Sequence, residues 1–334
     1  MSVELLNFIE TVLNGLMSGV MYSLVALGFV LIFKASGVFN FAQGVFALFA
    51  ALTLVGFQTG QIPFSHLINE LFGTNLHNWY PSLHSFLAIL LTIITMIILA
   101  WLVERLVLRH LVNQEPIILF MATIGLAFVL EGVGDLMWGS DVKVLDVGIP
   151  SGGSIWLEEA TIGWASQGSE YYGMYIDVLN VWATLIAIIL VTALALFSQY
   201  TKTGRALRAV ADDHQAALSV GISLRSIWIL VWGISGFIAM VAGIMWGTES
   251  GVQFSLSLIA LKALPVLILG GFTSIPGAII GGLLIGVGEK LAEIYIGGLL
   301  DIGAIENWFA YVLALVFLLF RPQGLFGDKI IERV

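Results

Sequence analysis

Long runs of apolar residues dominate the chain and constrain its fold more than any other feature. Nine such runs follow one another, at residues 11–33, 38–57, 86–108, 117–138, 178–199, 226–247, 256–271, 274–297 and 305–320. A helix that crosses a bilayer needs about 20 apolar residues, so 256–271 and 305–320 are short. Because backbone polar groups must be paired within lipid, we expect each run to be a helix. The sequence predicts an all-α polytopic membrane protein of about 8–10 spans, built as one domain over residues 1–334.

The composition supports a membrane protein and excludes several other classes. Hydrophobic residues make up 59% of the chain and charged residues 10%, whereas soluble domains carry about 25% charged residues. The absence of cysteine excludes disulfides and thiolate metal sites. A net charge of −9 argues against nucleic acid as a partner. The first ten residues contain no basic residue, so we expect no cleaved signal peptide.

The distribution of basic residues predicts the orientation in the membrane. Residues 58–85 contain no Lys or Arg, and residues 139–177 contain six acidic residues against Lys143 alone. Ten of the thirteen basic residues lie in the other connections, namely Lys34, Arg105, Arg109, Lys202, Arg205, Arg208, Arg225, Arg321, Lys329 and Arg333. Basic residues concentrate in cytoplasmic connections. We therefore expect 58–85 and 139–177 to be external loops, the N-terminus to lie outside and the C-terminus to lie in the cytoplasm.

A polar stretch at residues 200–226 separates two of the apolar runs. Its core, Gln-Ala-Ala followed by Gly four residues after the second Ala, predicts a short helix with little side-chain bulk that another protein can approach. Acidic residues favour the start of such a helix, and glycine can end it in a left-handed turn. A solvated connector would explain the basic residues but not this core. We predict a docking surface for a cytoplasmic partner formed by Arg205, Arg208, Asp212, Asp213, Gln215, Ala216, Ala217 and Gly221.

Two further stretches are candidates for the interior of the membrane domain. Pro276 and seven glycines interrupt residues 270–288, and broken helices are tolerated only against protein or a water-filled cavity. This stretch either lines a translocation path or forms a tight interhelical turn. The amides of Asn40 and Gln43 either line the same path or tie two helices together. The candidate path residues are Asn40, Gln43, Gly44, Gly270, Gly271, Pro276 and Gly277.

Six ionisable residues fall at or near membrane depth: Glu131, Asp135, Lys262, Glu289, Lys290 and Glu293. Such residues either have a function, for example in a proton relay, or extend to the membrane surface from helix ends. The nucleotide-binding P-loop and the signatures of zinc proteases and of serine hydrolases are absent from the sequence, and its five histidines are dispersed. We expect no enzymatic activity and no metal site.

The motifs resemble those of a known family. Residues 205–221 are similar to the coupling segment of ATP-binding-cassette (ABC) importer permeases, with Gln215 in place of Glu and without the distal part of that motif. Residues 14–28, the NFAQG of residues 40–44, residues 270–282 and the RPQGLFG of residues 321–327 are similar to the branched-chain amino-acid permeases of this class. Gln43 replaces a His and Thr273 a Gly of the family signatures. The resemblance runs in order from about Asn14 to Gly327.

This resemblance implies a permease subunit in a bacterial inner membrane. It would pair with a second permease subunit, expected to be a paralogue, with two cytoplasmic ATPases that bind ATP, and with an external solute-binding protein that delivers the solute. The permease itself would need no cofactor. The solute would be a branched-chain amino acid or a related compound; another amino acid, urea, a short amide and an aromatic acid stay open. The alternatives are a secondary transporter driven by an ion gradient through Glu131 or Glu289, a membrane-embedded enzyme and a passive channel.

Overall fold

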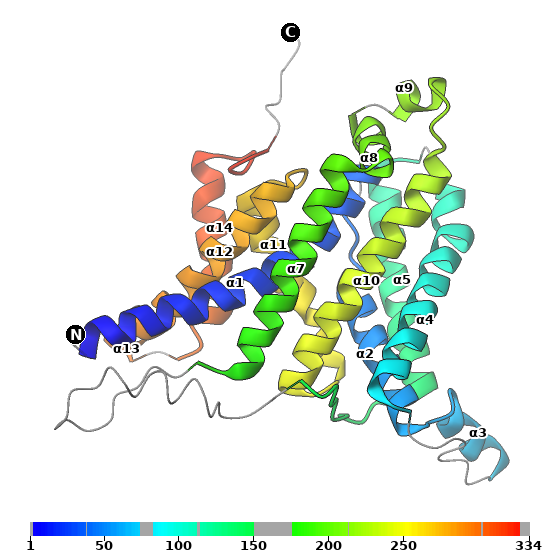
Figure 1. Cartoon of the computed structure of the whole chain (residues 1–334), viewed down its shortest axis with the longest axis horizontal. Coiled ribbons are helices and arrows are strands. Elements are labelled where there is room, and N and C mark those ends of the chain that lie inside the picture. Colours follow the sequence, from blue (N-terminus) through cyan, green and yellow to red (C-terminus); the bar gives the residue numbers. More distant parts are fainter. Residues whose placement is uncertain are drawn as a thin grey trace. The chain divides into compact units, whose positions relative to one another are not determined.

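A computed structural model confirms the all-α fold class (Figure 1). The structure describes residues 3–37, 39–73, 83–111, 114–149, 176–212, 214–301 and 303–327. Within these ranges it contains no strand, only an isolated antiparallel bridge between Lys143 and Val252. Parts of both predicted external loops, at 74–82 and 150–175, lie outside the described residues, as does the chain beyond Gly327.

The helices follow the predicted apolar runs. They are α1 (Val3–Ser36), α2 (Gln43–Thr59), α3 (Ser65–Phe72), α4 (Ser85–Leu106), η1 (Leu108–Leu111), α5 (Pro116–Trp138), α7 (Val178–Tyr200), α8 (Lys202–Asp212), α9 (His214–Ser219), α10 (Leu224–Ser250), η2 (Phe254–Leu258), α11 (Ile259–Gly270), α12 (Ile275–Leu291), η3 (Ala292–Gly297), α13 (Gly298–Leu300) and α14 (Glu306–Phe320). Six apolar helical segments of the described chain are long enough to cross a membrane, and three more, at 43–59, 254–270 and 306–320, are shorter. The chain is therefore a multi-pass membrane protein.

One of the shorter helices, α2, begins later than its apolar run. The run starts at residue 38, but the helix starts at Gln43. The Asn40 side chain explains the difference, because its Oδ1 accepts a hydrogen bond from the Ala42 backbone N–H at 3.1 Å. A side-chain turn of this kind competes with helical hydrogen bonding.

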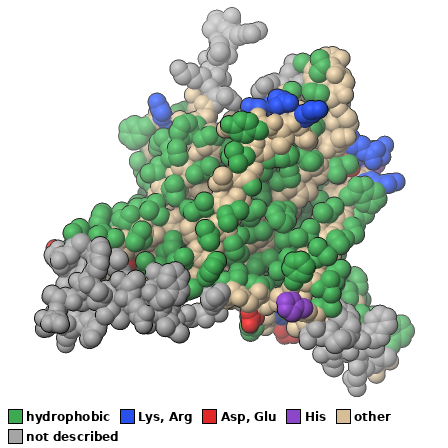
Figure 2. Space-filling model, in the orientation of Figure 1, with side chains coloured by type: hydrophobic (Ala, Val, Ile, Leu, Met, Phe, Trp, Pro, Cys, Tyr) green, Lys and Arg blue, Asp and Glu red, His purple; other side chains and the backbone are tan. Residues whose placement is uncertain are grey.

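The helices form two compact units, and the first to describe contains residues 27–148 and 194–261. In this unit α10 packs against α2 and α4, and α2 packs against α5. The apolar stretch that could cross a membrane is 72% buried in α10, but only 28% buried in α4 and 33% buried in α5. The exposed sides of α4 and α5 carry large hydrophobic residues, such as Ile97 and Phe128, as lipid contact requires. Basic side chains gather at the end of this unit that carries α8 (Figure 2).

The other unit contains residues 1–26, 149–193 and 262–334. Its α12 packs against α14 and, through glycines, against the first part of α1. The Ser23 hydroxyl of α1 donates to the backbone carbonyls of Gly19 at 2.8 Å and of Ile279 at 3.1 Å. The hydroxyl thus helps to join α1 to α12 where the two backbones are close.

Candidate functional site

The polar stretch at 200–226 forms two short helices, α8 and α9, which follow α7 through a tight corner at Thr201. The Thr201 hydroxyl donates to the Phe197 carbonyl at 2.6 Å and accepts from the Gly204 N–H at 2.9 Å. A Cβ at Gly204 would lie 2.6 Å from the Ser198 carbonyl oxygen. The corner therefore holds the start of α8 directly against the end of α7.

The two arginines predicted to face a partner lie across this corner. Arg205 Nη1 donates to the Tyr200 carbonyl at 3.3 Å, and Arg208 Nη2 donates to the Gln199 carbonyl at 3.2 Å. These carbonyls belong to the last turn of α7, where a cation is favourable because the helix leaves its final carbonyls without helical partners. The two arginines thus join α8 to α7 in addition to any contact with another protein.

The helix α9 ends as the sequence predicts. Gly221 has φ +84°, the left-handed conformation expected of the residue that follows a helix. The Ile222 N–H donates to the Ala217 carbonyl and the Gly221 N–H to the Leu218 carbonyl, both at 3.0 Å. Asp212 is the last residue of α8, Asp213 lies outside the described residues, and the side chains of Asp212 and Gln215 are not described.

The side chains of α9 differ in exposure from what the motif suggests. Ala216 is exposed, but Ala217 is only 2% exposed and faces inward. The most exposed apolar residues of this tip are Leu218 at 53% and Val220 at 74%. The sequence reasoning missed both, although two apolar side chains inside a polar connection were a signal for them. An apolar pair at the end of a short helix, with Leu218 in its last turn and Val220 just beyond it, suits a groove on another protein.

Both α8 and α9 pack against α10. Arg225, in the first turn of α10, forms an ion pair with Glu104 at the end of α4, with 3.9 Å between Nε and Oε1. The Glu104 side chain is 2% exposed, and its second oxygen, Oε2, has no hydrogen-bond partner. Arg225 therefore links the segment that follows α9 to a second long helix through a buried carboxylate.

The predicted path residues around Asn40 are buried and hydrogen-bonded to one another. Asn40 and Gln43 are 0% and 1% exposed. Asn40 Nδ2 donates to Gln43 Oε1 at 3.3 Å, and the Ser235 hydroxyl donates to the same oxygen at 2.7 Å. Gln43 Nε2 donates to the Ser235 carbonyl at 3.2 Å. A Cβ at Gly44 would meet the Ser257 carbonyl. These contacts tie α2 to α10.

The second group of path residues forms an interhelical turn closed by the tail of the chain. Gly271, with φ +100°, follows α11, and the Ser274 hydroxyl caps α12 by accepting from the Gly277 N–H at 3.0 Å. The backbones of Gly270 and Gly277 touch, and Pro276 is exposed. The Leu325 N–H donates to the Leu269 carbonyl at 2.8 Å, and the Phe326 N–H donates to that of Gly270 at 3.2 Å. Backbone hydrogen bonds thus hold the tail motif at 321–327 against the end of α11, where the motif at 270–282 begins.

The ionisable residues near the end of α12 have distinct environments. Lys290 pairs with Glu306 at 2.7 Å, and the Glu293 carboxylate accepts from the N–H groups of Ala304 at 3.1 Å and Glu306 at 2.9 Å. Glu289 is 2% exposed rather than at a surface. On α5, Glu131 is half-buried and Asp135 is exposed. The described residues contain no group of three or more His, Cys, Asp or Glu that could hold a metal ion.

Comparison with known proteins decides the family. Residues 11–321 match the family described as "Branched-chain amino acid transport system / permease component". The chain belongs to this family. The match contains every motif discussed above except the tail motif at 321–327, of which it contains Arg321 alone. The family describes permease components, so the chain itself is not expected to be catalytic.

Curated relatives of this permease are similar over their full length. The chain is 28% identical to the "High-affinity branched-chain amino acid transport system permease protein LivH" of Escherichia coli, with both chains fully covered. It is 27% identical to the corresponding protein BraD of Pseudomonas aeruginosa over 99% of each chain. It is 29% identical to a probable LivH of Methanocaldococcus jannaschii over 91% of this chain and 88% of that one. A chain of PsaBC from Streptococcus pneumoniae covers 93% of this permease at 11% identity and a TM-score of 0.43, a likeness that carries no argument.

Replacing Gln43 of this permease by Leu should lower its free energy of unfolding by about 2 kcal/mol, because the substitution removes the acceptor of the buried Asn40 Nδ2 and one of the two acceptors of the Ser235 hydroxyl, which keeps the Gly28 carbonyl at 3.1 Å. Gln43→His is the matched control, since imidazole keeps a donor and an acceptor and His is the residue of the family signature. Thermal unfolding in detergent, followed by tryptophan fluorescence, measures both. Equal losses in the two variants would contradict the role of hydrogen bonding.

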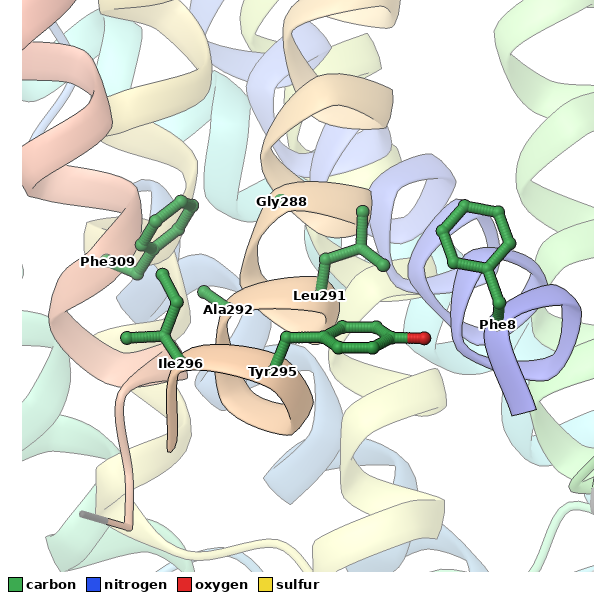
Figure 3. A pocket seen from close by; sticks show the side chains of 7 residues that line it. All are labelled: Phe8, Gly288, Leu291, Ala292, Tyr295, Ile296 and Phe309. Atoms are coloured by element: carbon green, nitrogen blue, oxygen red, sulfur yellow. The ribbon is translucent and has the colours of Figure 1, made fainter. Parts of the chain in front are cut away.

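A groove on this permease lies beside the end of α12, but its chemistry does not suit a polar solute. Its volume is about 570 Å³, and it is lined by Phe8, Gly288, Leu291, Ala292, Tyr295, Ile296 and Phe309. Figure 3 shows Phe8 of α1 and Phe309 of α14 on opposite sides of the η3 residue Tyr295. The lining is hydrocarbon apart from the Tyr295 hydroxyl. It offers no charged group to an amino acid, so we do not assign the solute site to it.

Proposed function

We propose that the protein is the membrane-spanning subunit of an ABC importer that takes up branched-chain amino acids or a related small polar solute. The observation that carries this proposal is the α8–α9 segment, a short projecting pair of helices with exposed apolar side chains. Arginines join it to α7, and it packs against α10. A force applied to its tip would therefore reach two long helices.

The proposal includes partners and an orientation. Two ATPases would bind ATP and dock on the 200–226 segment from the cytoplasm, and a second permease subunit would complete the membrane domain. An external binding protein would deliver the solute on the side of the acidic loops. Basic residues in the other connections support a cytoplasmic C-terminus in the inner membrane. ATP hydrolysis would take place on the partner subunits, and this chain would need no cofactor.

Leu218→Glu and Val220→Glu should each detach the ATPase, because a charge replaces an apolar anchor at the proposed interface. Ala217→Arg is a poorer test, since Ala217 is buried and the larger side chain would disturb α9 itself. The matched control is Leu299→Glu, which introduces the same charge at a residue that is 85% exposed on α13. The native complex is purified in mild detergent, and its ATPase content and leucine uptake in vesicles are measured.

We expect leucine uptake to fall at least about ten-fold in both tip variants, the effect of removing an interface anchor. The Leu299→Glu control should retain the ATPase and take up leucine as the native complex does. Uptake that needs no ATP and follows an ion gradient would overturn the importer and favour a secondary transporter. Retention of the ATPase by both tip variants would overturn the docking surface.

A further inference from the structure

One polar cluster at membrane depth has no role in the function described so far. It lies within the unit that contains α12, and its members are Tyr22 of α1, Lys262 of α11, Glu289 of α12 and Tyr311 of α14. The Tyr22 side chain is hydrogen-bonded to the Glu289 carboxylate, and the positive charge of Lys262 also acts on that carboxylate. The Lys262 ammonium also lies 5.9 Å from the centre of the Tyr22 ring.

Charged neighbours on the same helix show what a purely structural role looks like. Lys290 closes onto Glu306 at 2.7 Å, and Glu293 caps the start of α14. Among the residues that the structure describes, the pairs within ion-pair distance are Lys290 with Glu306 and Arg225 with Glu104, and Lys262 does not form one with Glu289. The opposite charges are thus close enough to interact but are not in direct contact.

Such an arrangement is costly unless a ligand uses it. Removing a carboxylate and an ammonium from water carries a large desolvation penalty, which direct contact with full hydrogen bonding offsets best. A carboxylate can accept about four hydrogen bonds, so the bond from Tyr22 uses only part of the capacity of Glu289, and the ammonium of Lys262, which lies over the Tyr22 ring, can donate three. Ionisable residues inside membrane domains usually mark solute or ion paths.

We propose that Glu289 and Lys262 bind the two charged groups of a zwitterionic amino acid within the membrane domain. The Glu289 carboxylate accepts from the α-ammonium of the solute, and the Lys262 ammonium donates to its α-carboxylate. The Tyr22 side chain lies against both protein charges and sets the orientation of Glu289. This inference rests on the proposed function and names the part of the solute that the permease recognises.

The local structure of α12 allows this site to change. The helix continues directly into the π-helix η3 at Ala292, less than one turn after Glu289. Wider turns of this kind break the regular hydrogen bonding and are frequent at functional sites. Glu289 is closed off from solvent in this structure, so solute would reach it in another conformation, as alternating access requires.

The test uses the complete complex in lipid nanodiscs without the binding protein, with solute binding measured by saturation-transfer NMR. The three probes are leucine, 4-methylpentanoate, which lacks the ammonium, and 3-methylbutylamine, which lacks the carboxylate. Glu289→Gln should weaken leucine binding at least about ten-fold, as expected for the loss of a charged hydrogen bond, and leave 4-methylpentanoate unchanged. Lys262→Met should weaken leucine binding similarly and leave 3-methylbutylamine unchanged.

Lys290→Met is the matched control, because it removes a charge of the same region that is already paired, and its leucine binding should equal that of the native complex. A purely structural role of the cluster would weaken all three probes alike in both variants, and this result would overturn the proposal. ATP-driven uptake of leucine is measured on the same complexes after reconstitution into closed lipid vesicles, with the external binding protein added. If the native complex takes up leucine but Glu289→Gln and Lys262→Met bind it normally, the site is wrong and the importer stands. If the native complex takes up no leucine, the proposed function fails and the site with it.

Discussion

Replacing Gly286 by Val should prevent the unit that contains α12 and the first part of α1 from folding. A Cβ at Gly286 would meet the backbone of Gly15 and Gly19, and one at Gly282 would lie 2.6 Å from the Gly19 carbonyl oxygen. Both contacts are with backbone atoms, which cannot move aside as a flexible side chain can. Overpacking commonly costs about 1–3 kcal/mol, and the branched Val side chain would force apart two helix backbones along their whole contact. We expect no folded protein to be recovered from membranes.

Gly125→Val is the matched control for this prediction. It makes the same substitution in the middle of α5, where a Cβ would meet nothing within 4 Å. The yield of monodisperse protein in detergent, measured by fluorescence-detected size exclusion, should stay near the native level for Gly125→Val and fall to background for Gly286→Val. Recovery of folded Gly286→Val protein with unchanged melting temperature would show that the helices are not in backbone contact.

The sequence was sufficient to predict the helices. A run of apolar residues commits a segment to a helix in lipid, because hydrophobicity and backbone pairing act on each segment separately. The start of α2 was less predictable, since the Asn40 side chain, although part of an apolar run, forms a turn instead of continuing a helix.

The candidate sites were less predictable because exposure depends on which helix packs beside which. The Gln-Ala-Ala core suggested that both alanines face a partner, whereas the structure turns Ala217 inward and exposes Leu218 and Val220. Similarly, no pattern along α12 distinguishes Glu289 from Glu293. Their difference arises from distant residues, namely Lys262 and Tyr22 for the first and the start of α14 for the second. Whether the predicted path residues line the path stays a prediction.

Replacing Arg225 by Ala should cost much more stability than replacing Glu104 by Leu. Arg225→Ala leaves the Glu104 carboxylate buried without its cation, with Oε2 already unpaired. Breaking a buried pair in this way costs about 3–5 kcal/mol, and since half of the Arg225 side chain is exposed we expect the lower value, about 3 kcal/mol. Glu104→Leu removes the buried charge itself and leaves a solvated arginine, so the melting temperature should change little or rise.

Variants of the Arg225–Glu104 pair should separate an effect on stability from an effect on the coupling of leucine uptake to ATP hydrolysis. Because only residues 220–223 separate α9 from α10, the ion pair with Glu104 fixes α4 to the part of α10 that a docked ATPase would move. Glu104→Leu should therefore give a stable complex with reduced leucine uptake per ATP hydrolysed, whereas Arg225→Ala should lose stability as well. Melting curves from tryptophan fluorescence and the uptake-to-hydrolysis ratio in vesicles measure the two effects. If both substitutions destabilise the protein equally, the pair contributes through direct attraction. If coupling is unchanged in Glu104→Leu, the force from α9 reaches the membrane-spanning helices through the contacts of α8 with α7 and α10 instead.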